Sequence, residues 1–433
     1  MGSGSGLEFG LGLGGGDAAP LRVEGVLPPD LEGTFVRIGP GGLHAVELRE
    51  GRAVSYRACQ SAADANVFWH AGSLLALPEA GIPLQYSREL DEEAFGGGLT
   101  LDIASHVKFD AARGRRVLFG VEEGAESTTL RLGEWAGDGS LVAAQSVALE
   151  RATWQHDLGV TASSIVFIES PTEPLGGGDE AAAAAVPYGW VPGAEGWLGV
   201  VRREDVRGVV AEPQWVKVDP CLVTHVLGAF DDGDDGVVLF VVVYPAPEVG
   251  QPVAGVAPGV SVVGPDGIGR SLIGGGLGVL ERWSVRGGRL ERAVVDERFV
   301  EYPRVDAMLE GAAFRYGYGV ELALVAERVE QVGLLKFDVG RDEVAAWSPG
   351  AGLVAGEPVF VRAVDGRGDD EGWLLTVVDD AGRGGSDLWV LDASSIGGRR
   401  RGLGHPQAVV HLPDGARLPF RSHGEWVSAE KYR

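Results

Sequence analysis

Short apolar segments recur along the whole chain and are separated by clusters of glycine and charged residues. The clearest segments are GTFVRIG (33–39), RVLFGV (116–121), SIVFIES (164–170), GVVLFVVVY (236–244), LALVAE (322–327), GWLLTVV (372–378) and DLWVLDA (387–393). They are rich in Val, Leu, Phe and Trp, which are enriched in strands, and turn sequences such as DDGDDG and AGRGG lie between them. Few stretches keep a 3.6-residue apolar period over the length of a helix. The pattern therefore predicts an all-β protein.

A loose repeat relates these segments to one another. A strand ends, a short charged turn with glycine follows, and the next strand begins, as in FDAARGRRV, WSVRGGRLE and FDVGRDEV. Long all-β chains form sandwich arrays, large barrels or propellers, and a sandwich array would need linkers, of which the sequence has none. We therefore expect a seven-bladed β-propeller with ~60 residues per blade, somewhat longer than the roughly 40–50 of compact repeats.

Glycine content and the two ends of the chain define the domain. The 433 residues include 69 glycines, more than twice the roughly 7% of average usage, which fits many hairpin turns. Residues 1–19 are glycine-rich and lack the basic start and long apolar stretch of a signal peptide, so we interpret them as a flexible leader. No apolar run approaches the length needed to cross a bilayer. We expect residues 20–433 to form a single propeller domain, with 176–186 as a loop insertion.

Charge and cysteine content exclude several classes of function. A net charge of −25 would repel a phosphate backbone or an anionic lipid surface, so we expect no nucleic-acid partner, and any peripheral membrane contact would have to be hydrophobic. The only cysteines are Cys59 and Cys221, too few for a disulfide scaffold or a cysteine-based zinc site. We expect a cytoplasmic protein, or a plastid one if the leader is a truncated transit peptide.

Four of the eight histidines stand in strand-like contexts: His106, His156, His225 and His423. Their separations of 50, 69 and 198 residues correspond to about one, one and three blade steps. Inner strands of successive blades converge on a propeller axis, where such side chains could meet. A single strand histidine is more often structural than a ligand, and the spacing alone leaves a four-histidine site as the minority interpretation. The chain has no P-loop and no H-E-x-x-H motif.

The segments around these histidines are SHVKFD, HDLGVT, HVLGAFDDGD and SHGEWV. They resemble the patterns A-H-P-K-x-D, H-D-F-x-x-T, H-x-x-N-A-[YFW]-E-D-G-D and F-H-G-x-W-V of the carotenoid cleavage oxygenases, a family that also contains stilbene-cleaving oxygenases and the retinal pigment epithelium isomerohydrolase. Four further segments are similar to family motifs: GTFVRIGPGG (33–42), VFWHAGSLLALPEAG (67–81), EYPRVDAMLEGAAFRYGY (301–318) and GEPVFVRAVDGRGDDEGWLLTVV (356–378). The eight matches occur in family order and span about residues 20–430.

The resemblance implies that His106, His156, His225 and His423 bind one Fe(II) on the propeller axis, beneath a cap of loops. Neutral imidazole suits Fe(II), and carboxylates behind the ligands can orient the rings and balance the charge. The family's three such glutamates correspond to Glu79, Glu301 and Glu357. One histidine is then left without a glutamate partner, and we expect a backbone group or packing to fix it.

The implied activity is that of a non-haem dioxygenase, which cleaves a conjugated C=C bond with O₂ into two carbonyl products. Pro78 stands where stilbene cleavers have a lysine, and Glu93 where they have a tyrosine. A small apolar carotenoid or apocarotenoid is therefore the preferred substrate, and no protein partner is implied. The alternatives are a stilbene-cleaving oxygenase, an isomerohydrolase, a propeller lactonase with calcium or zinc, and a non-catalytic interaction platform.

Departures from the family patterns lie next to the metal-site histidines. They are Val107, Leu158, Gly228, Asp231 and Ser422. None is a candidate ligand, so we expect them to change the packing around the iron and the shape of the substrate tunnel. Among the other histidines, His70 is expected to be structural. His44, His405 and His411 are expected in solvated loops.

Overall fold

The computed structural model describes residues 20–39, 41–95, 102–124, 128–174, 188–246, 277–325, 328–397, 405–418 and 422–432. The expected leader, 1–19, and the expected insertion, 176–186, lie outside these residues. Within the described ranges the helices are three short 3-10 turns: η1 (Ala307–Leu309), η2 (Ala393–Ser395) and η3 (Ala429–Tyr432). None of the helices described has the length and apolar character of a membrane span.

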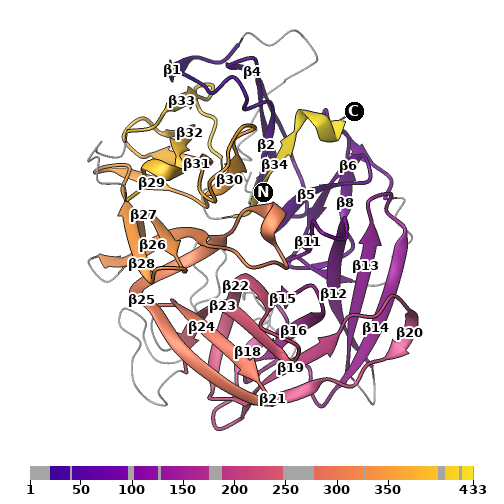
Figure 1. Ribbon diagram of the computed structural model, residues 1–433. Coiled ribbons are helices and arrows are strands. Elements are labelled where there is room, and N and C mark those ends of the chain that lie inside the picture. Colours follow the sequence, from indigo (N-terminus) through magenta and orange to yellow (C-terminus); the bar gives the residue numbers. More distant parts are fainter. Residues whose placement is uncertain are drawn as a thin grey trace, which may run out of the picture.

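Sheets that are antiparallel, except for the parallel pairing of β20 with β14, follow one another around a central axis in chain order, from indigo through magenta to yellow in Figure 1. Blade I contains β34 (Gly424–Ser428), β2 (Gly33–Gly39), β3 (Gly42–Arg49) and β4 (Arg52–Cys59). Blade II contains β5 (Asn66–His70), β6 (Ser73–Leu77), β8 (Leu84–Tyr86) and β9 (Glu92–Glu93). Blade III contains β11 (Lys108–Asp110), β12 (Arg115–Glu123), β13 (Thr128–Ala136), β14 (Leu141–Leu149) and β20 (Arg207–Val210). Blade IV contains β15 (Leu158–Val160), β16 (Ser164–Glu169), β19 (Gly196–Arg202) and β21 (Gln214–Val218).

The next sheet has seven strands and comprises two blades. Its strands are β22 (Cys221–Asp231), β23 (Gly236–Pro245), β24 (Val279–Arg286), β25 (Arg289–Arg304), β26 (Tyr316–Val325), β27 (Arg328–Asp338) and β28 (Glu343–Trp347). The first part of β25 pairs with β24 as the outer strand of blade V, and its last residues pair with β26 as the inner strand of blade VI. Blade VII contains β30 (Val359–Arg362), β29 (Leu353–Ala355), β31 (Gly372–Asp380), β32 (Gly385–Asp392), β33 (Ala408–His411) and β1 (Val23–Gly25). The prediction of an all-β, seven-bladed propeller is confirmed.

The two ends of the described chain close the ring. The N-terminal β1 adds to blade VII by pairing with β33, whereas the C-terminal β34 forms the inner strand of blade I and pairs with β2. A closed ring leaves each blade packed between two neighbours, so the inner strands are buried on both faces. In β16, for example, Ile165 and Phe167 face blade III while Val166 and Ile168 face blade V. Burial on both faces explains why SIVFIES reads as a continuous apolar run without alternation.

Two small sheets lie at the end of the axis where the inner strands begin. One pairs β7 (Ala80–Gly81) with β10 (Ile103–Ala104), and the other pairs β17 (Thr172–Pro174) with β18 (Tyr188–Trp190). Other long connections, which the expected cap would include, fall partly on residues outside the described ranges.

Candidate metal centre

The four histidines singled out from the sequence come from the inner strands of four blades. His106, His156 and His423 lie one or two residues before β11, β15 and β34, and His225 lies near the start of β22. These strands belong to blades III, IV, I and V, so the steps from His106 to His156, His225 and His423 are one, one and three blades. The structure thus brings together side chains that are up to 317 residues apart in the chain.

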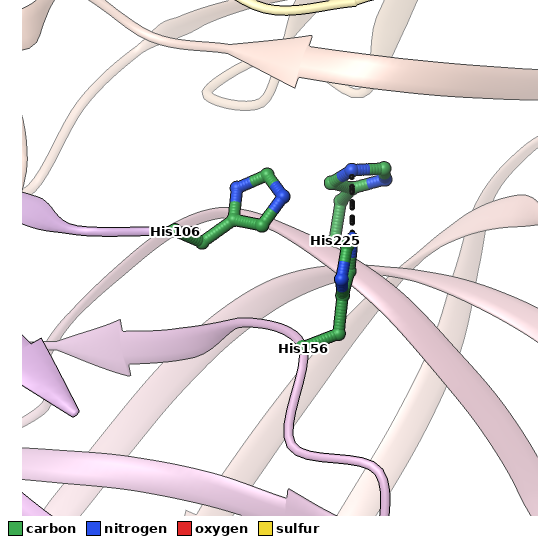
Figure 2. Close-up of side chains that lie close together, drawn as sticks. All are labelled: His106, His156 and His225. Atoms are coloured by element: carbon green, nitrogen blue, oxygen red, sulfur yellow. Dashed lines mark hydrogen bonds between the residues drawn. The ribbon is translucent and has the colours of Figure 1, made fainter. Parts of the chain in front are cut away.

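The imidazole rings meet in a buried cluster on the axis. The ring centre of His106 lies 4.4 Å from that of His156, 4.9 Å from that of His225 and 4.6 Å from that of His423. A nitrogen of each of His106, His156 and His225 lies within 4.8 Å of a nitrogen of the other two (Figure 2). His423 completes the cluster from the other side, with its ring centre 5.4 Å from that of His225.

Each of the three predicted glutamates contacts the Nδ1 atom of a different histidine. Glu79 lies 2.5 Å from Nδ1 of His156, Glu301 lies 2.5 Å from that of His225, and Glu357 lies 2.7 Å from that of His423. A carboxylate at Nδ1 holds the proton on that nitrogen and leaves Nε2 as the free electron-pair donor. Among the described residues, no glutamate contacts His106, the fourth ring.

When a carboxylate holds the ring proton at Nδ1, the Nε2 atoms of His156 and His225 carry no proton with which to bond to each other. Nε2 of His156 lies 3.4 Å from Nε2 of His225, and with both protons held at Nδ1 the two face each other as acceptors. Nε2 of His106 is buried and has no hydrogen-bond partner within the described part of the chain. Buried acceptors without a donor are costly unless a cation binds between them. The donor set therefore fits a metal ion that prefers imidazole, such as iron, copper, zinc or nickel.

Two of the glutamates are held by neutral donors. Glu79 accepts a hydrogen bond from Nε1 of Trp154 at 3.2 Å, and the Trp154 ring lies 4.5 Å from the ring of His156. Glu301 accepts from the hydroxyl of Thr224 at 2.9 Å and from the hydroxyl of Tyr244. In both carboxylates burial acts to raise the pKa, but the adjacent histidine and these donors outweigh it and hold the pKa below its ordinary value.

Glu357 is neutralised by two arginines. Oε2 accepts from the guanidinium of Arg37 at 3.2 Å, and both side chains are fully buried. Oε1 lies 3.4 Å from Nε of Arg304, and the backbone N–H of Gly424 donates to Oε2 at 2.9 Å. Burial acts to raise the pKa of Glu357, but Arg304, His423 and Arg37 outweigh it and lower the pKa to about 2. This carboxylate is therefore ionised at any ordinary pH.

The pKa shifts of two of the four rings favour metal binding. Burial, and then the neighbouring histidines, hold the pKa of His106 well below its usual value. Burial also lowers the pKa of His423, although Glu357 opposes it. For His156, burial acts to lower the pKa, but Glu79 outweighs it and raises the pKa. His106 and His423 are thus neutral near pH 7, the form in which imidazole binds a metal.

Several residues of the site were not assigned a role from the sequence. Arg37 and Arg304 lie inside the motifs GTFVRIG and EYPR, and an arginine within an apolar strand signals a buried partner. Trp154 lies two residues before His156, which is a weaker signal. The positions of Thr224 and Tyr244 carry no sequence signal, because only the fold brings them to Glu301.

The remaining histidines are outside the centre, but two expectations about them were wrong. His44 lies in β3, where it contacts the hydroxyl of Tyr56 at 2.9 Å, and His411 ends β33 beside Asp387 at 3.2 Å. Neither is in a solvated loop. His405 is exposed, and His70 is buried with its ring stacked 5.3 Å from that of Trp135, which suits a structural role.

Comparison with known proteins shows which family the chain resembles over most of its length. The family model of retinal pigment epithelial membrane protein (RPE65) matches residues 49–428. A carotenoid cleavage oxygenase of Mycobacterium tuberculosis is 26% identical over 95% of this chain and 94% of its own. Lignostilbene-alpha,beta-dioxygenase isozyme III of Sphingomonas paucimobilis is 23% identical over 96% of this chain and 95% of its own.

Solved structures share the fold. Cobalt-substituted Synechocystis ACO superimposes with a TM-score of 0.78 at 20% identity, covering 94% of this chain and 95% of that one. The lignostilbene dioxygenase of Pseudomonas brassicacearum gives a TM-score of 0.76 at 21% identity, covering 95% of each chain. Because the family model covers most of the sequence and the relatives span nearly its whole length, the chain belongs to the RPE65 family of carotenoid and stilbene cleavage oxygenases.

Proposed function

We propose that this protein is a non-haem Fe(II)-dependent dioxygenase that cleaves a conjugated C=C bond of a carotenoid or apocarotenoid into two carbonyl products. The observation that carries the proposal is the arrangement of the histidines, three with Nδ1 held by a carboxylate and Nε2 left to donate to a metal. His106, His156, His225 and His423 would hold the ion, which supplies activation of O₂ when bound. Four neutral ligands without a carboxylate leave coordination positions for O₂ and substrate.

The chain's own residues would orient the ligands and supply an apolar wall. Glu79, Glu301 and Glu357 keep a proton on Nδ1 and so fix the ring orientation. Trp154 packs on His156, and the ring of Tyr302 lies 5.9 Å from that of His225 and 5.5 Å from that of His423. Trp154 belongs to the same apolar cluster as Tyr188 and Trp190 of the β17–β18 sheet. Such aromatic surfaces suit a polyene.

A phenolic stilbene has less support as the substrate. Pro78 has no charge to meet a phenol oxygen. Glu93 is exposed on β9, where it accepts hydrogen bonds from Gln85 and Ser73. A propeller lactonase would bind its metal through aspartate, asparagine and glutamate, and membership of an oxygenase family favours the histidine centre over it.

The test is anaerobic reconstitution with Fe(II), followed by metal analysis and a screen of apocarotenals and stilbenes for aldehyde products. We expect about one iron per chain and aldehydes from apocarotenals. His156→Ala and His225→Ala should each lose both iron and activity. Retention of calcium instead of iron, or full activity in either variant, would overturn the proposal. Aldehydes from stilbenes alone would assign the alternative substrate.

A further inference from the structure

An ion pair lies on the axis immediately beside the histidine cluster. Nζ of Lys108 lies 2.7 Å from Oδ1 of Asp157 and donates to Oδ2 at 2.9 Å. The side chain of Asp157 is 2% exposed and that of Lys108 is 14% exposed. The pair is separate from the three carboxylates that contact Nδ1 of His156, His225 and His423.

The pair, which joins Lys108 of blade III to Asp157, bonds to the backbone of blades IV and V next to two further ligands. Asp157 accepts from the N–H of Leu158 at 2.7 Å and from the N–H of Val226 at 2.7 Å. Lys108 also donates to the carbonyl of Val226 at 3.3 Å. Lys108 is two residues after His106, Asp157 follows His156, and Val226 follows His225. One ion pair thus connects the strand starts that present three of the four rings.

The geometry links the pair most directly to His106. Lys108 begins β11 and lies two residues after His106, so a very short stretch of chain connects the ion pair to this ring. The other three rings are each oriented by a carboxylate, whereas no glutamate within the described residues contacts His106. A buried lysine fixed by an aspartate and a carbonyl allows the strand beside it little movement.

We propose that Lys108 and Asp157 are positioning residues of the metal centre, which hold the strand starts of blades III, IV and V in register and fix His106 in place of the carboxylate that this ring lacks. The inference rests on the proposed function, since it assigns a role toward the metal that the histidines would bind. If the inference is right, removal of the pair should weaken metal binding by more than the loss of folding stability can explain.

The test uses the double variant K108M/D157N, because removing one partner alone would leave a buried charge and could prevent folding. The matched control is K336M/D370N. Nζ of Lys336 likewise lies 2.6 Å from an oxygen of Asp370 and donates to a carbonyl, that of Ala393, at 2.8 Å. Within the described part of the chain, the hydrogen bonds and ion pair of this second pair involve no residue of a histidine-bearing strand. Circular dichroism checks that all proteins fold, and Co²⁺ titration followed by visible absorption measures affinity.

We expect K108M/D157N to bind Co²⁺ about 10–100-fold more weakly than the wild type, the range seen when groups behind metal ligands are removed. The control variant should bind within about twofold of the wild type. Affinity unchanged in K108M/D157N, or lowered equally in both double variants, would overturn the inference while leaving the proposed function intact. A wild-type chain that binds neither Co²⁺ nor Fe²⁺ would instead overturn the proposed function.

A double-mutant comparison separates positioning of His106 from a general effect on folding. If the pair acts through His106, adding K108M/D157N to His106→Ala should weaken Co²⁺ binding by less than about threefold, because the ring it positions is already gone. If K108M/D157N weakened Co²⁺ binding as much in the His106→Ala background as in the wild type, the pair would act through another ligand. That result would remove the assignment to His106.

Discussion

At the scale of the residue, the carboxylates in and near the metal centre differ in what neutralises them. Glu357 has two arginines, Glu79 has only neutral donors besides its histidine, and Glu169 has an oxygen without a partner in the described structure. The charge of a bound dication would therefore be balanced mainly by Glu79 and Glu301, since Arg37 and Arg304 already compensate Glu357. The same side-chain type thus serves orientation, charge balance and arginine pairing.

The contrast between Glu79 and Glu357 gives a paired prediction. Glu79→Gln and Glu357→Gln should each weaken metal binding about 10–100-fold, because each loosens one ring. Only Glu357→Gln should also lower the free energy of unfolding, by about 3–5 kcal/mol, because it breaks the fully buried ion pair between Glu357 and Arg37. Metal titration and denaturant unfolding of the two metal-free variants measure this. Equal stability of the two variants would show that the ion pair between Glu357 and Arg37 does not stabilise the fold.

Glu169 provides a pH-dependent prediction. Burial raises its pKa from 4.5 to about 7, against the pull of Arg151. The folded state therefore binds the proton more tightly than the unfolded state, and stability falls as the pH rises between these two values. By pH 8 the cost is about 3 kcal/mol. Glu169→Gln should match the wild type near pH 4 and be more stable at pH 8.

Denaturant unfolding at pH 4, 6 and 8 checks this, with Glu173→Gln as the control. Glu173 is exposed in β17, and its substitution should leave the pH profile unchanged. If the free energy of unfolding of Glu169→Gln changed with pH in the same way as that of the wild type, the raised pKa of Glu169 would be contradicted.

At the scale of the element, β22 shows how a departure from the family is accommodated. Gly228 lies three residues after His225, where the family pattern has asparagine. A Cβ atom at this position would lie 2.6 Å from Cε1 of Phe314, whose ring packs on β22 from the segment between η1 and β26. The aromatic ring therefore occupies the space of the missing side chain, and the packing beside the third histidine is tight.

Restoring the family residue should be unfavourable unless the ring is reduced. Gly228→Asn should lower the free energy of unfolding by about 1–3 kcal/mol through overpacking. Phe314→Leu should relieve part of this loss, so the double variant should be more stable than the sum of the single changes implies. Gly137→Asn, at a turn where a Cβ meets only Gly114 at 4.0 Å, is the control. If the stability changes of Gly228→Asn and Phe314→Leu simply added in the double variant, the side chain at position 228 would not be in contact with the ring of Phe314.

Regular elements could be predicted from the sequence, and irregular ones could not. The segment GTFVRIG has the same bounds as β2, and GVVLFVVVY matches β23 to within one residue, because both are apolar and end at glycine or a turn. The strands β7 and β10 have two residues each, too few for any periodicity. In β25, Tyr302 has a φ of 52°, within a register shift that lets both Glu301 and Arg304 reach the axis. The sequence of β25 contains no glycine from which a positive φ could have been predicted.

The candidate site, too, could be predicted from the sequence only in part. The histidines and glutamates stand in motifs, so their numbers could be named before the fold was known. The partners of those residues depend on which blades are neighbours. Arg37 reaches Glu357 across 320 residues of sequence, and local pattern has no means of specifying such a pair.

At the scale of the whole molecule, the ring depends on strands from the two ends of the described chain. β34 pairs with β2 as the inner strand of blade I, and it begins directly after His423. β1 is only the outermost strand of blade VII. Removal of residues 422–433 should therefore abolish cooperative thermal unfolding and metal binding, because an inner strand and a ligand are lost.

A chain starting at residue 27, which lacks β1, should keep a single cooperative transition at a lower midpoint temperature. Differential scanning calorimetry of both truncations measures this. Cooperative unfolding of the chain without residues 422–433 would show that the ring does not need β34 for closure.

The strand shared between blades V and VI makes one seven-stranded sheet out of two blades. Continuous pairing from β22 to β28 makes this part of the ring the best candidate for a single cooperative unit of local unfolding. His225 and Glu301 both belong to it, whereas the pairs formed by His156 and His423 join separate sheets. Amide protons of β23, β24 and β26 should exchange together and last. If the other blades unfold locally first, the contact between His225 and Glu301 should therefore be the last contact of the metal centre to be lost.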